Sequence, residues 1–191
     1  MNKLVFNKNT LFSAVLLIVV VAILMKITPA HVDNVFTLVV SKNRSSILDI
    51  HQTRDIETSK TYRIDRIDLA EKSRFRHKEL GDLGFGNDYF ADIEAPFTVH
   101  IAGDYVFYIG SDDGFAFEVD GRQVCEWTHT KDQHDRPFAT DSCQIRLKEG
   151  EHRFKLSYYQ GYGNAGLVMS YSNTSNSSQY LAGQNSKFIS F

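Results

Sequence analysis

Apolar residues recur at every second position in short runs through the C-terminal half of the chain, and these runs end at glycine-containing turns. Within Gly103–Gly121, Tyr105, Phe107 and Ile109 alternate with their neighbours before the sequence Ser-Asp-Asp-Gly, and the next run ends at Asp-Gly. Side chains of a strand point alternately to its two faces, and Asp-Gly is a strong hairpin signal. The expected strands are 89–101, 105–109, 115–119, 122–127, 145–148, 154–159 and 167–171. Short strands at this spacing, with no convincing helix among them, predict an all-β fold, an antiparallel β-sandwich.

Size and charge restrict the class of protein further. The chain has 191 residues, of which 42% are hydrophobic and 13% aromatic, enough for one globular domain with a real core. Its formal net charge of −2 argues against nucleic acid as a partner. Residues 81–191 carry fifteen acidic and eight basic side chains, whereas residues 60–80 carry seven basic and four acidic ones.

The N-terminus is predicted to direct the chain to a membrane. Residues 1–9 contain Lys3 and Lys8, and residues 10–27 contain the uncharged run LFSAVLLIVVVAILM before Lys26. This pattern is typical of an uncleaved single-pass anchor or of a cleaved signal peptide. The expected anchor includes Leu11, Leu17, Val21 and Met25. With the positive flank inside, the remaining chain is expected in the periplasm or the extracellular space.

Two cysteines agree with an oxidising compartment. Cys125 and Cys143 are expected to form a disulfide, because two cysteines outside the cytoplasm most often pair. The alternative is two separate buried thiols.

The region before the regular strands is harder to interpret. Residues 28–80 are expected to form a stalk and divergent first strands, and VDNVFTLVV (32–40) is either a strand or the start of a stalk. The basic cluster from Lys72 to Lys78 is either a solvated face or a contact for anionic lipid or an acidic partner. Residues 173–191 are a polar tail with a possible final edge strand at 187–191.

Asp112 and Asp113 form the most distinctive candidate site. Adjacent side chains of a regular strand point to opposite faces, so both carboxylates converge on one partner only if the backbone between them is distorted, for instance by a cis peptide. A bound cation would stabilise such a distortion. In the alternative interpretation Asp112 caps the turn, and Gly114 takes an unusual backbone angle.

The two stretches YFADIEAPFTVHIAGDYVFYIGSDDGFAFEVDGRQV and IRLKEGEHRFKLSYYQGYGNAGLVMSY resemble the anthrax protective-antigen domain family, the PA-fourteen domain. The resemblance covers Asp88 to about Ser172, and the domain is expected at 81–172. It implies a β-sandwich of a kind found in bacterial toxins and adhesins, in glycosidases, and in yeast flocculins and epithelial adhesins.

The adhesin branch of that family implies a site. There, two aspartates joined by a cis peptide bind calcium, which holds vicinal hydroxyls of a sugar, and a second loop adds an asparagine and backbone carbonyls. Carried over, the metal ligands are Asp112, Asp113 and Asn164, with Gln160 behind Asn164 in the second loop. Calcium prefers six to eight oxygen ligands, which leaves room for sugar hydroxyls.

Aromatic side chains complete this candidate site. Tyr162 and Trp127, with Tyr159, offer an apolar wall for a sugar ring, although aromatic residues at strand ends more often belong to the core.

Other interpretations receive less support. His129 and His134 with Asp132 and Asp135 suggest a transition-metal site, but a charged loop accounts for them better. The glycines of GDLGFGNDYF lack the strand, helix and Lys-Ser/Thr context of a phosphate-binding loop. Adjacent aspartates are too close for the two carboxylates of a glycosidase, so no enzymatic activity is expected.

Two functions therefore remain. The first is an anchored, extracytoplasmic module that binds a glycan or polysaccharide through calcium. The second is a structural subunit of a membrane protein complex, in which the sandwich contacts partner proteins.

Overall fold

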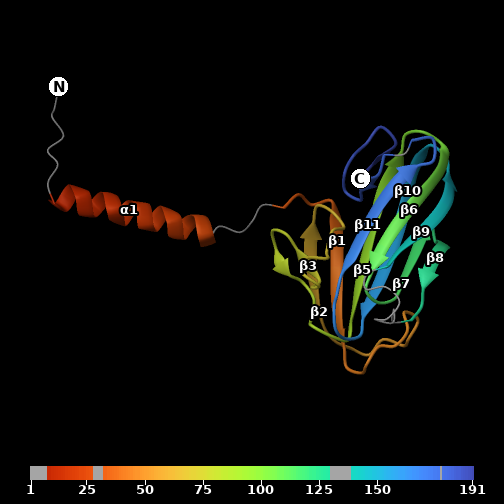
Figure 1. The fold of residues 1–191 in the computed structure, drawn as a ribbon, viewed down its shortest axis with the longest axis horizontal. Coiled ribbons are helices and arrows are strands. Elements are labelled where there is room, and N and C mark those ends of the chain that lie inside the picture. The colour runs from red at the N-terminus through yellow and green to blue at the C-terminus, as the bar shows by residue number, and fades with distance from the viewer. Residues whose placement is uncertain (1–7, 28–31, 130–138, 177) are drawn as a thin grey trace. The chain divides into compact units, whose positions relative to one another are not determined.

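The computed structural model describes residues 8–27, 32–129, 139–176 and 178–191 of a chain that divides into two compact units, Met1–His31 and Val32–Phe191. The first unit contains one helix, α1 (Lys8–Ile27), drawn in red in Figure 1. The expected anchor residues Leu11, Leu17, Val21 and Met25 all lie on it. Within the described ranges, no helix combines the length and the hydropathy needed to cross a membrane.

The second unit consists of antiparallel strands in two sheets. The strands are β1 (Phe36–Asn43), β2 (Ile56–Ile64), β3 (Arg76–His77), β4 (Gly81–Asp82), β5 (Tyr89–Val99), β6 (Gly103–Ser111), β7 (Phe115–Val119), β8 (Arg122–Trp127), β9 (Ala139–Leu147), β10 (Gly150–Gln160), β11 (Leu167–Asn173), β12 (Tyr180–Leu181) and β13 (Ile189–Ser190). The larger sheet has the order β2-β1-β5-β10-β7-β8, with β13 on β5. The smaller sheet has the order β12-β11-β6-β9, and β3 and β4 form a separate hairpin.

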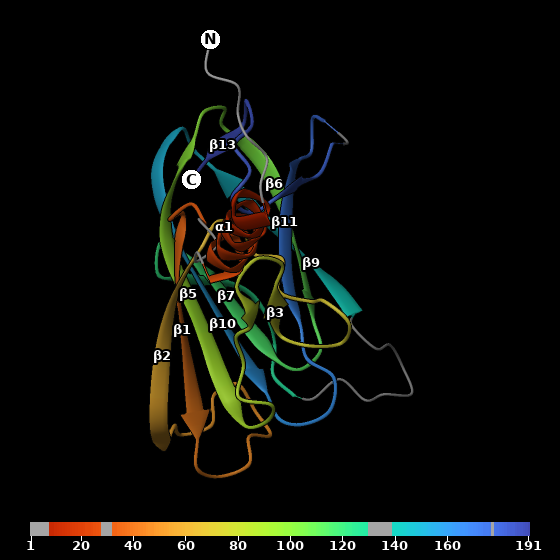
Figure 2. The ribbon, with the colours of Figure 1, turned by 90° about the vertical axis from the view of Figure 1, so that its left-hand side faces the viewer.

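The two sheets pack face to face, as Figure 2 shows, and enclose one aromatic-rich core. Along β7 and most of β5 every second residue is buried in this core, which is the pattern that the alternation predicts. Phe107 of β6 and Phe117 of β7 join the two layers, with ring centroids 5.0 Å apart. The predicted all-β sandwich is confirmed.

The sandwich begins earlier in the chain than the expected boundary at residue 81. β1 lies between β2 and β5 inside the larger sheet, and Leu38 and Val40 of β1 are fully buried. Residues 32–64 therefore supply two strands of the sandwich. At the other end of the chain, the expected final strand is present as β13, which pairs with the end of β5.

A disulfide joins the two sheets. Cys125 on β8 belongs to the larger sheet and Cys143 on β9 to the smaller one, and their sulfur atoms are bonded. The predicted pairing is confirmed.

Candidate functional site

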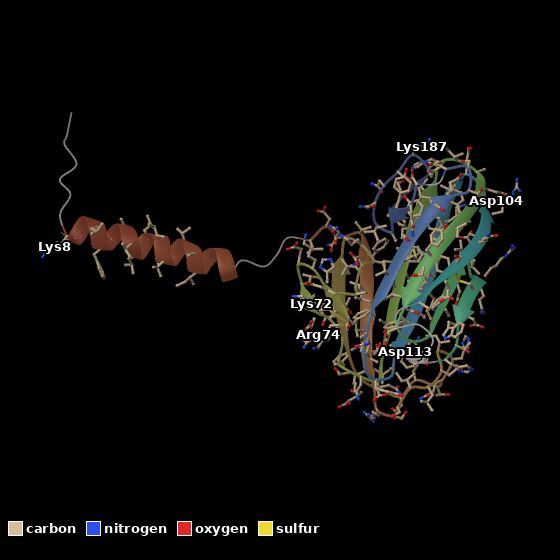
Figure 3. The ribbon with its side chains drawn as sticks, in the orientation of Figure 1. Lys8, Lys72, Arg74, Asp104, Asp113 and Lys187 are labelled. Carbon is tan, nitrogen blue, oxygen red and sulfur yellow. A yellow bond between two sulfur atoms is a disulfide. The ribbon has the colours of Figure 1, made fainter. Side chains whose placement is uncertain are left out.

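Four chain segments meet at one end of the sandwich. These are the bend between β6 and β7, the end of β8, the 44–55 loop and the 160–166 loop. Figure 3 shows Asp113 toward this end, away from Lys187 and Asp104. The Tyr159 hydroxyl donates to the Leu48 carbonyl over 3.0 Å, and the Ile50 N–H donates to the Thr128 carbonyl over 3.0 Å. These bonds hold the 44–55 loop against the end of the larger sheet.

The two aspartates occupy different environments within the bend. Asp113 is only 1% exposed, and its Oδ2 accepts a hydrogen bond of 2.7 Å from the Gly161 N–H. Asp112 is half-buried, and its N–H donates to the Gly166 carbonyl over 3.2 Å. The bend is thus bonded to both ends of the 160–166 loop.

The expectation of a cis peptide between the aspartates is wrong. No peptide bond in the described part of the chain is cis, and the chain bends at Asp112 and Asp113 with trans bonds. A bend of this kind breaks the strict alternation of a strand, so the two side chains need not point to opposite faces.

Gly114 is required for a reason other than the backbone angle of the alternative interpretation. Its φ is not in the left-handed region, but a Cβ placed there would lie 2.4 Å from Cε1 of Tyr159 and 2.7 Å from the Trp127 carbonyl oxygen. The glycine of the Asp-Asp-Gly triplet therefore permits a close approach between the bend, β10 and the end of β8.

The other predicted site residues divide into buried and exposed groups. Gln160 is fully buried: its Oε1 accepts from the Tyr158 hydroxyl, and its Nε2 donates to the Tyr162 carbonyl over 3.0 Å. Its amide is therefore engaged in holding the loop. Tyr162 and Trp127 are 68% and 44% exposed, and the Asn164 side chain is also exposed. Those three side chains are accessible to a ligand.

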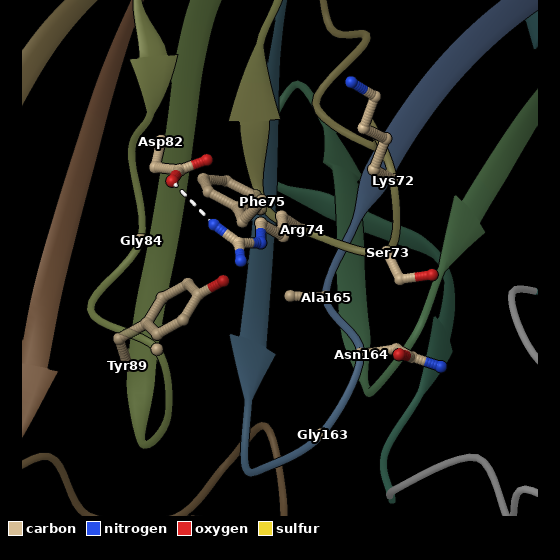
Figure 4. Close-up of a pocket in the computed structure, with 11 residues that line it drawn as sticks. Lys72, Ser73, Arg74, Phe75, Asp82, Gly84, Tyr89, Gly163, Asn164 and Ala165 are labelled. Atoms are coloured by element: carbon tan, nitrogen blue, oxygen red, sulfur yellow. Dashed lines mark hydrogen bonds and ion pairs between the residues drawn. The ribbon is translucent and has the colours of Figure 1, made fainter.

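A pocket of about 470 Å³ lies beside the 160–166 loop (Figure 4). Gly163, Asn164 and Ala165 line it together with the segment 72–75. The Ala165 N–H donates to the Ser73 carbonyl over 3.1 Å, which joins these two segments. The remaining lining residues are Asp82, Gly84, Gly86 and Tyr89. The volume is typical of a small-molecule site.

Tyr89 connects this pocket to the aspartates. Burial raises the pKa of its hydroxyl well above 10, and the negative charges of Asp113 and Asp112 raise that pKa further. The same three causes act on the buried hydroxyl of Tyr158 and also raise its pKa, together with the charge of Tyr89. Both carboxylates therefore act on the same pair of tyrosines, whose hydroxyls stay neutral donors at physiological pH.

The basic stretch 72–78 is only partly a solvated face. Arg76 pairs with Glu71 and Asp82 at 3.0 Å each, and His77 is buried with its Nε2 2.8 Å from Asp65. Lys72 and Arg74 line the pocket instead.

The histidine cluster is described only in part. His129 lies 3.2 Å from Asp49, whereas Asp132, His134 and Asp135 fall outside the described residues. Within the part of the chain that the structure describes, no group of three or more His, Cys, Asp and Glu side chains forms a metal site.

Comparison with known proteins supports the fold. The sequence matches no protein-family model and no curated protein. Among solved structures it is similar to the PA14 domain of the antifreeze protein MpAFP, with 14% identity and a TM-score of 0.58 over 85% of this chain and 94% of that chain. It is also similar to the PA14 sugar-binding domain of an RTX adhesin, with 17% identity and a TM-score of 0.56 over 79% and 95% of the two chains.

A third similar structure is the A domain of epithelial adhesin 6 from Candida glabrata, in complex with Galβ1-3GlcNAc. The identity is 9% and the TM-score 0.55, over 86% of this chain and 90% of that chain. At these identities the likeness shows the fold alone: this chain has a PA14-like β-sandwich.

The sequence alone did not indicate that Lys72, Arg74 and Tyr89 line a pocket. Lys72 and Asn164 are far apart in the chain, and no local pattern indicates that they share a pocket. The only available signal was the basic cluster itself.

Proposed function

We propose that Val32–Phe191 is a carbohydrate-binding module and that it binds a glycan at the end of the sandwich formed by the bend and the 160–166 loop. One observation carries this proposal: the exposed rings of Tyr162 and Trp127 and the exposed amide of Asn164 lie at the end where the aspartates are. Exposed aromatic rings beside polar groups suit the apolar faces and hydroxyls of a sugar. Two structures of the same fold, a sugar-binding adhesin domain and an adhesin in complex with a disaccharide, support the proposal.

We further propose that this glycan binding depends on calcium. Asp112, Asp113 and Asn164 offer only oxygen ligands, which is the donor set that calcium prefers. The bend that carries both aspartates is hydrogen-bonded to both ends of the 160–166 loop, which carries Asn164. Asp113 Oδ2 accepts from the Gly161 N–H, and Asp112, Asp113 and Asn164 are the side chains that would contact the calcium ion. A bound calcium would supply a charge that attracts sugar hydroxyls.

We also propose that the module binds its glycan without hydrolysing it. The adjacent aspartates offer no pair of carboxylates separated across a cleft, as glycoside hydrolysis requires. Incubation of bound oligosaccharides with the protein, followed by mass spectrometry, tests this point: intact ligands agree with it, and shortened ligands contradict it.

The location outside the cytoplasm is supported by the Cys125–Cys143 disulfide, because disulfides persist mainly in oxidising compartments. The role of residues 10–27 as an anchor or a signal peptide stays a prediction. N-terminal sequencing of the mature protein and membrane fractionation distinguish the two.

The second candidate function is a structural subunit of a membrane assembly. The apolar side chains of α1 are exposed, and a continuous exposed apolar surface indicates contact with lipid or with another protein. Purification in mild detergent tests this: a stoichiometric partner protein supports the assembly, and a lone monomer contradicts it.

A glycan array probed with the full chain, followed by calorimetric titration with and without a calcium chelator, tests the main proposal. We expect binding in the micromolar-to-millimolar range that the chelator and Asn164→Ala weaken. Asp104→Asn, at the far end of β6, is the matched control and should bind normally. Binding that survives both the chelator and Asp112→Ala/Asp113→Ala would contradict the calcium mechanism.

A further inference from the structure

A tight hairpin that carries basic side chains lines the pocket beside the 160–166 loop. Glu71 and Arg74 exchange backbone hydrogen bonds of 3.1 and 3.2 Å, and Lys72 and Ser73 form the two-residue turn between them. Both turn residues have left-handed backbones, with φ of 54° and 59°. This turn normally favours Asn-Gly, but here it places a lysine and a serine at the edge of the pocket.

A buried hydroxyl in the pocket lacks an internal partner. Tyr89 is 0% exposed, and its hydroxyl makes no hydrogen bond with any described residue. In Figure 4 this hydroxyl points from β5 into the space between Arg74 and Ala165. Gly84 lies against the same ring, because a Cβ there would be 2.8 Å from the Tyr89 oxygen. A buried donor without a partner is costly, and it therefore indicates where a ligand oxygen fits.

The charge of the pocket lining is positive overall. Lys72 forms no ion pair or hydrogen bond with the described residues, and Arg74 pairs only with Asp82, at 3.3 Å and with 69% of its side chain exposed. Asp82 is shared, because its other oxygen pairs with Arg76 at 3.0 Å. The lining therefore has two cationic side chains and one carboxylate, which Arg76 also uses. A ligand with one negative charge would be attracted to it.

We propose that this pocket binds the carboxylate of an acidic sugar, such as a uronic acid residue within a polysaccharide. Arg74 and Lys72 would attract the carboxylate, and the Tyr89 hydroxyl would donate to one of its oxygens. The exposed Asn164, which lines both this pocket and the proposed sugar site, would contact hydroxyls of the same chain. This inference rests on the proposed carbohydrate binding and names the class of saccharide.

Matched pairs of oligosaccharides test the inference. Trimers of galacturonic, glucuronic and mannuronic acid are each titrated against the full chain beside the corresponding neutral trimer, which differs only at C6. We expect at least one acidic trimer to bind about tenfold more tightly than its neutral partner, the effect of one hydrogen bond to a charged group. This preference should shrink at high salt, because the cations are exposed.

Variants locate the preference. Lys72→Gln/Arg74→Gln should abolish the difference between acidic and neutral trimers, whereas Arg146→Gln, an exposed arginine on β9, should preserve it. A preference that persists in Lys72→Gln/Arg74→Gln overturns the inference. Equal binding of acidic and neutral trimers also overturns it but leaves carbohydrate binding in place. Binding of no glycan at all overturns both.

Tyr89→Phe gives a readout that a merely structural role would not produce. Removal of the hydroxyl should lower affinity for the acidic trimer several-fold. The same change should leave the melting temperature of the free protein equal or raise it by about 2–4 °C, because an unpaired buried donor disappears. Unchanged affinity in Tyr89→Phe would remove Tyr89 from the site.

Discussion

At the scale of single residues, Gly114 shows how the Asp-Asp-Gly triplet shapes the site. A Cβ at this position would collide with the Tyr159 ring and the Trp127 carbonyl. We expect Gly114→Ala to lower the free energy of unfolding by about 3 kcal/mol, the cost of a severe steric overlap. Gly121→Ala is the control, because its Cβ would meet nothing within 4 Å and only its φ of 71° is strained. Denaturant unfolding measures both, and equal losses would show that close packing is not the reason for Gly114.

Asp113 supplies the second prediction at this scale. Its buried carboxylate accepts from the Gly161 N–H, so Asp113→Ala would leave that donor unpaired inside the protein. The expected loss is about 1–3 kcal/mol of unfolding free energy. Asp113→Asn can keep an oxygen toward Gly161 and should lose less stability while still weakening calcium-dependent binding. If the alanine and asparagine variants are equally stable, the Gly161 bond does not hold the loop.

The sequence identified the two aspartates but not how they act. The triplet pointed to Asp112 and Asp113 as a site, whereas the cis bond and the unusual backbone angle that the alternative interpretation gave Gly114 were wrong. The role of Gly114 depends on Tyr159 and Trp127, which approach it only in the folded sandwich. No pattern along the chain contains that information.

At the scale of elements, the disulfide fastens β8 of one sheet to β9 of the other. Its two cysteines are separated by 18 positions, and a loop of that size is worth about 3 kcal/mol in the chain-entropy model. We expect Cys125→Ser/Cys143→Ser to lose roughly that amount in denaturant unfolding. The same loss should follow chemical reduction of the wild-type protein. No change on reduction would mean that the bridge does not constrain the unfolded chain.

A charged pair links the β7–β8 turn to β10. His152 Nδ1 lies 2.7 Å from Asp120 Oδ2, and His152 Nε2 lies 3.0 Å from the Lys148 carbonyl oxygen. Burial lowers the pKa of His152, but its bonds to Asp120 and Lys148 outweigh that effect and raise the pKa above 6.5. Burial likewise raises the pKa of Asp120, but its bonds from His152 and Arg153 lower it below 3.8.

The stabilisation from this pair should therefore depend on pH. The histidine contribution is complete below pH 6.5 and disappears as pH rises through the raised pKa. The aspartate contribution is complete above pH 3.8 and disappears as pH falls through the lowered pKa. The difference in unfolding free energy between wild type and His152→Gln should be largest at about pH 5 and should shrink as pH rises above 6.5 and through the raised pKa of His152. A difference independent of pH would contradict this assignment.

The strands divide into those that the sequence could predict and those that it could not. β7 and β8 occur at the predicted residues, and β6, β10 and β11 contain the predicted ones. Alternating apolar residues marked β6, β7, β10 and β11, and the Asp120-Gly121 turn marked the start of β8. β2 was not recognised, because it is an edge strand whose residues 57–61 are all exposed. An edge strand with two polar faces has no alternation to detect.

At the scale of the whole molecule, the fold brings together residues that are distant in the chain. The pocket joins the 72–75 segment, Tyr89 at the start of β5 and the 163–165 loop. Each segment alone resembled a turn, a strand or a charged surface. Their combination arises only because the 65–85 region packs along β11, where Leu69 and Leu167 exchange backbone hydrogen bonds. The class of fold was predictable from the sequence, whereas the pocket required the tertiary structure.

The central claim is that glycan binds at the end of the sandwich formed by the bend and the 160–166 loop. The most direct test is backbone amide NMR of the full chain during titration with an oligosaccharide selected on the array. We expect amide shifts at Asp112, Asp113, Tyr162 and Asn164, and none at Asp104, Gly121 or Gly150 near the opposite ends of the strands. Shifts confined to that opposite end, or no shifts at saturating glycan, would contradict it.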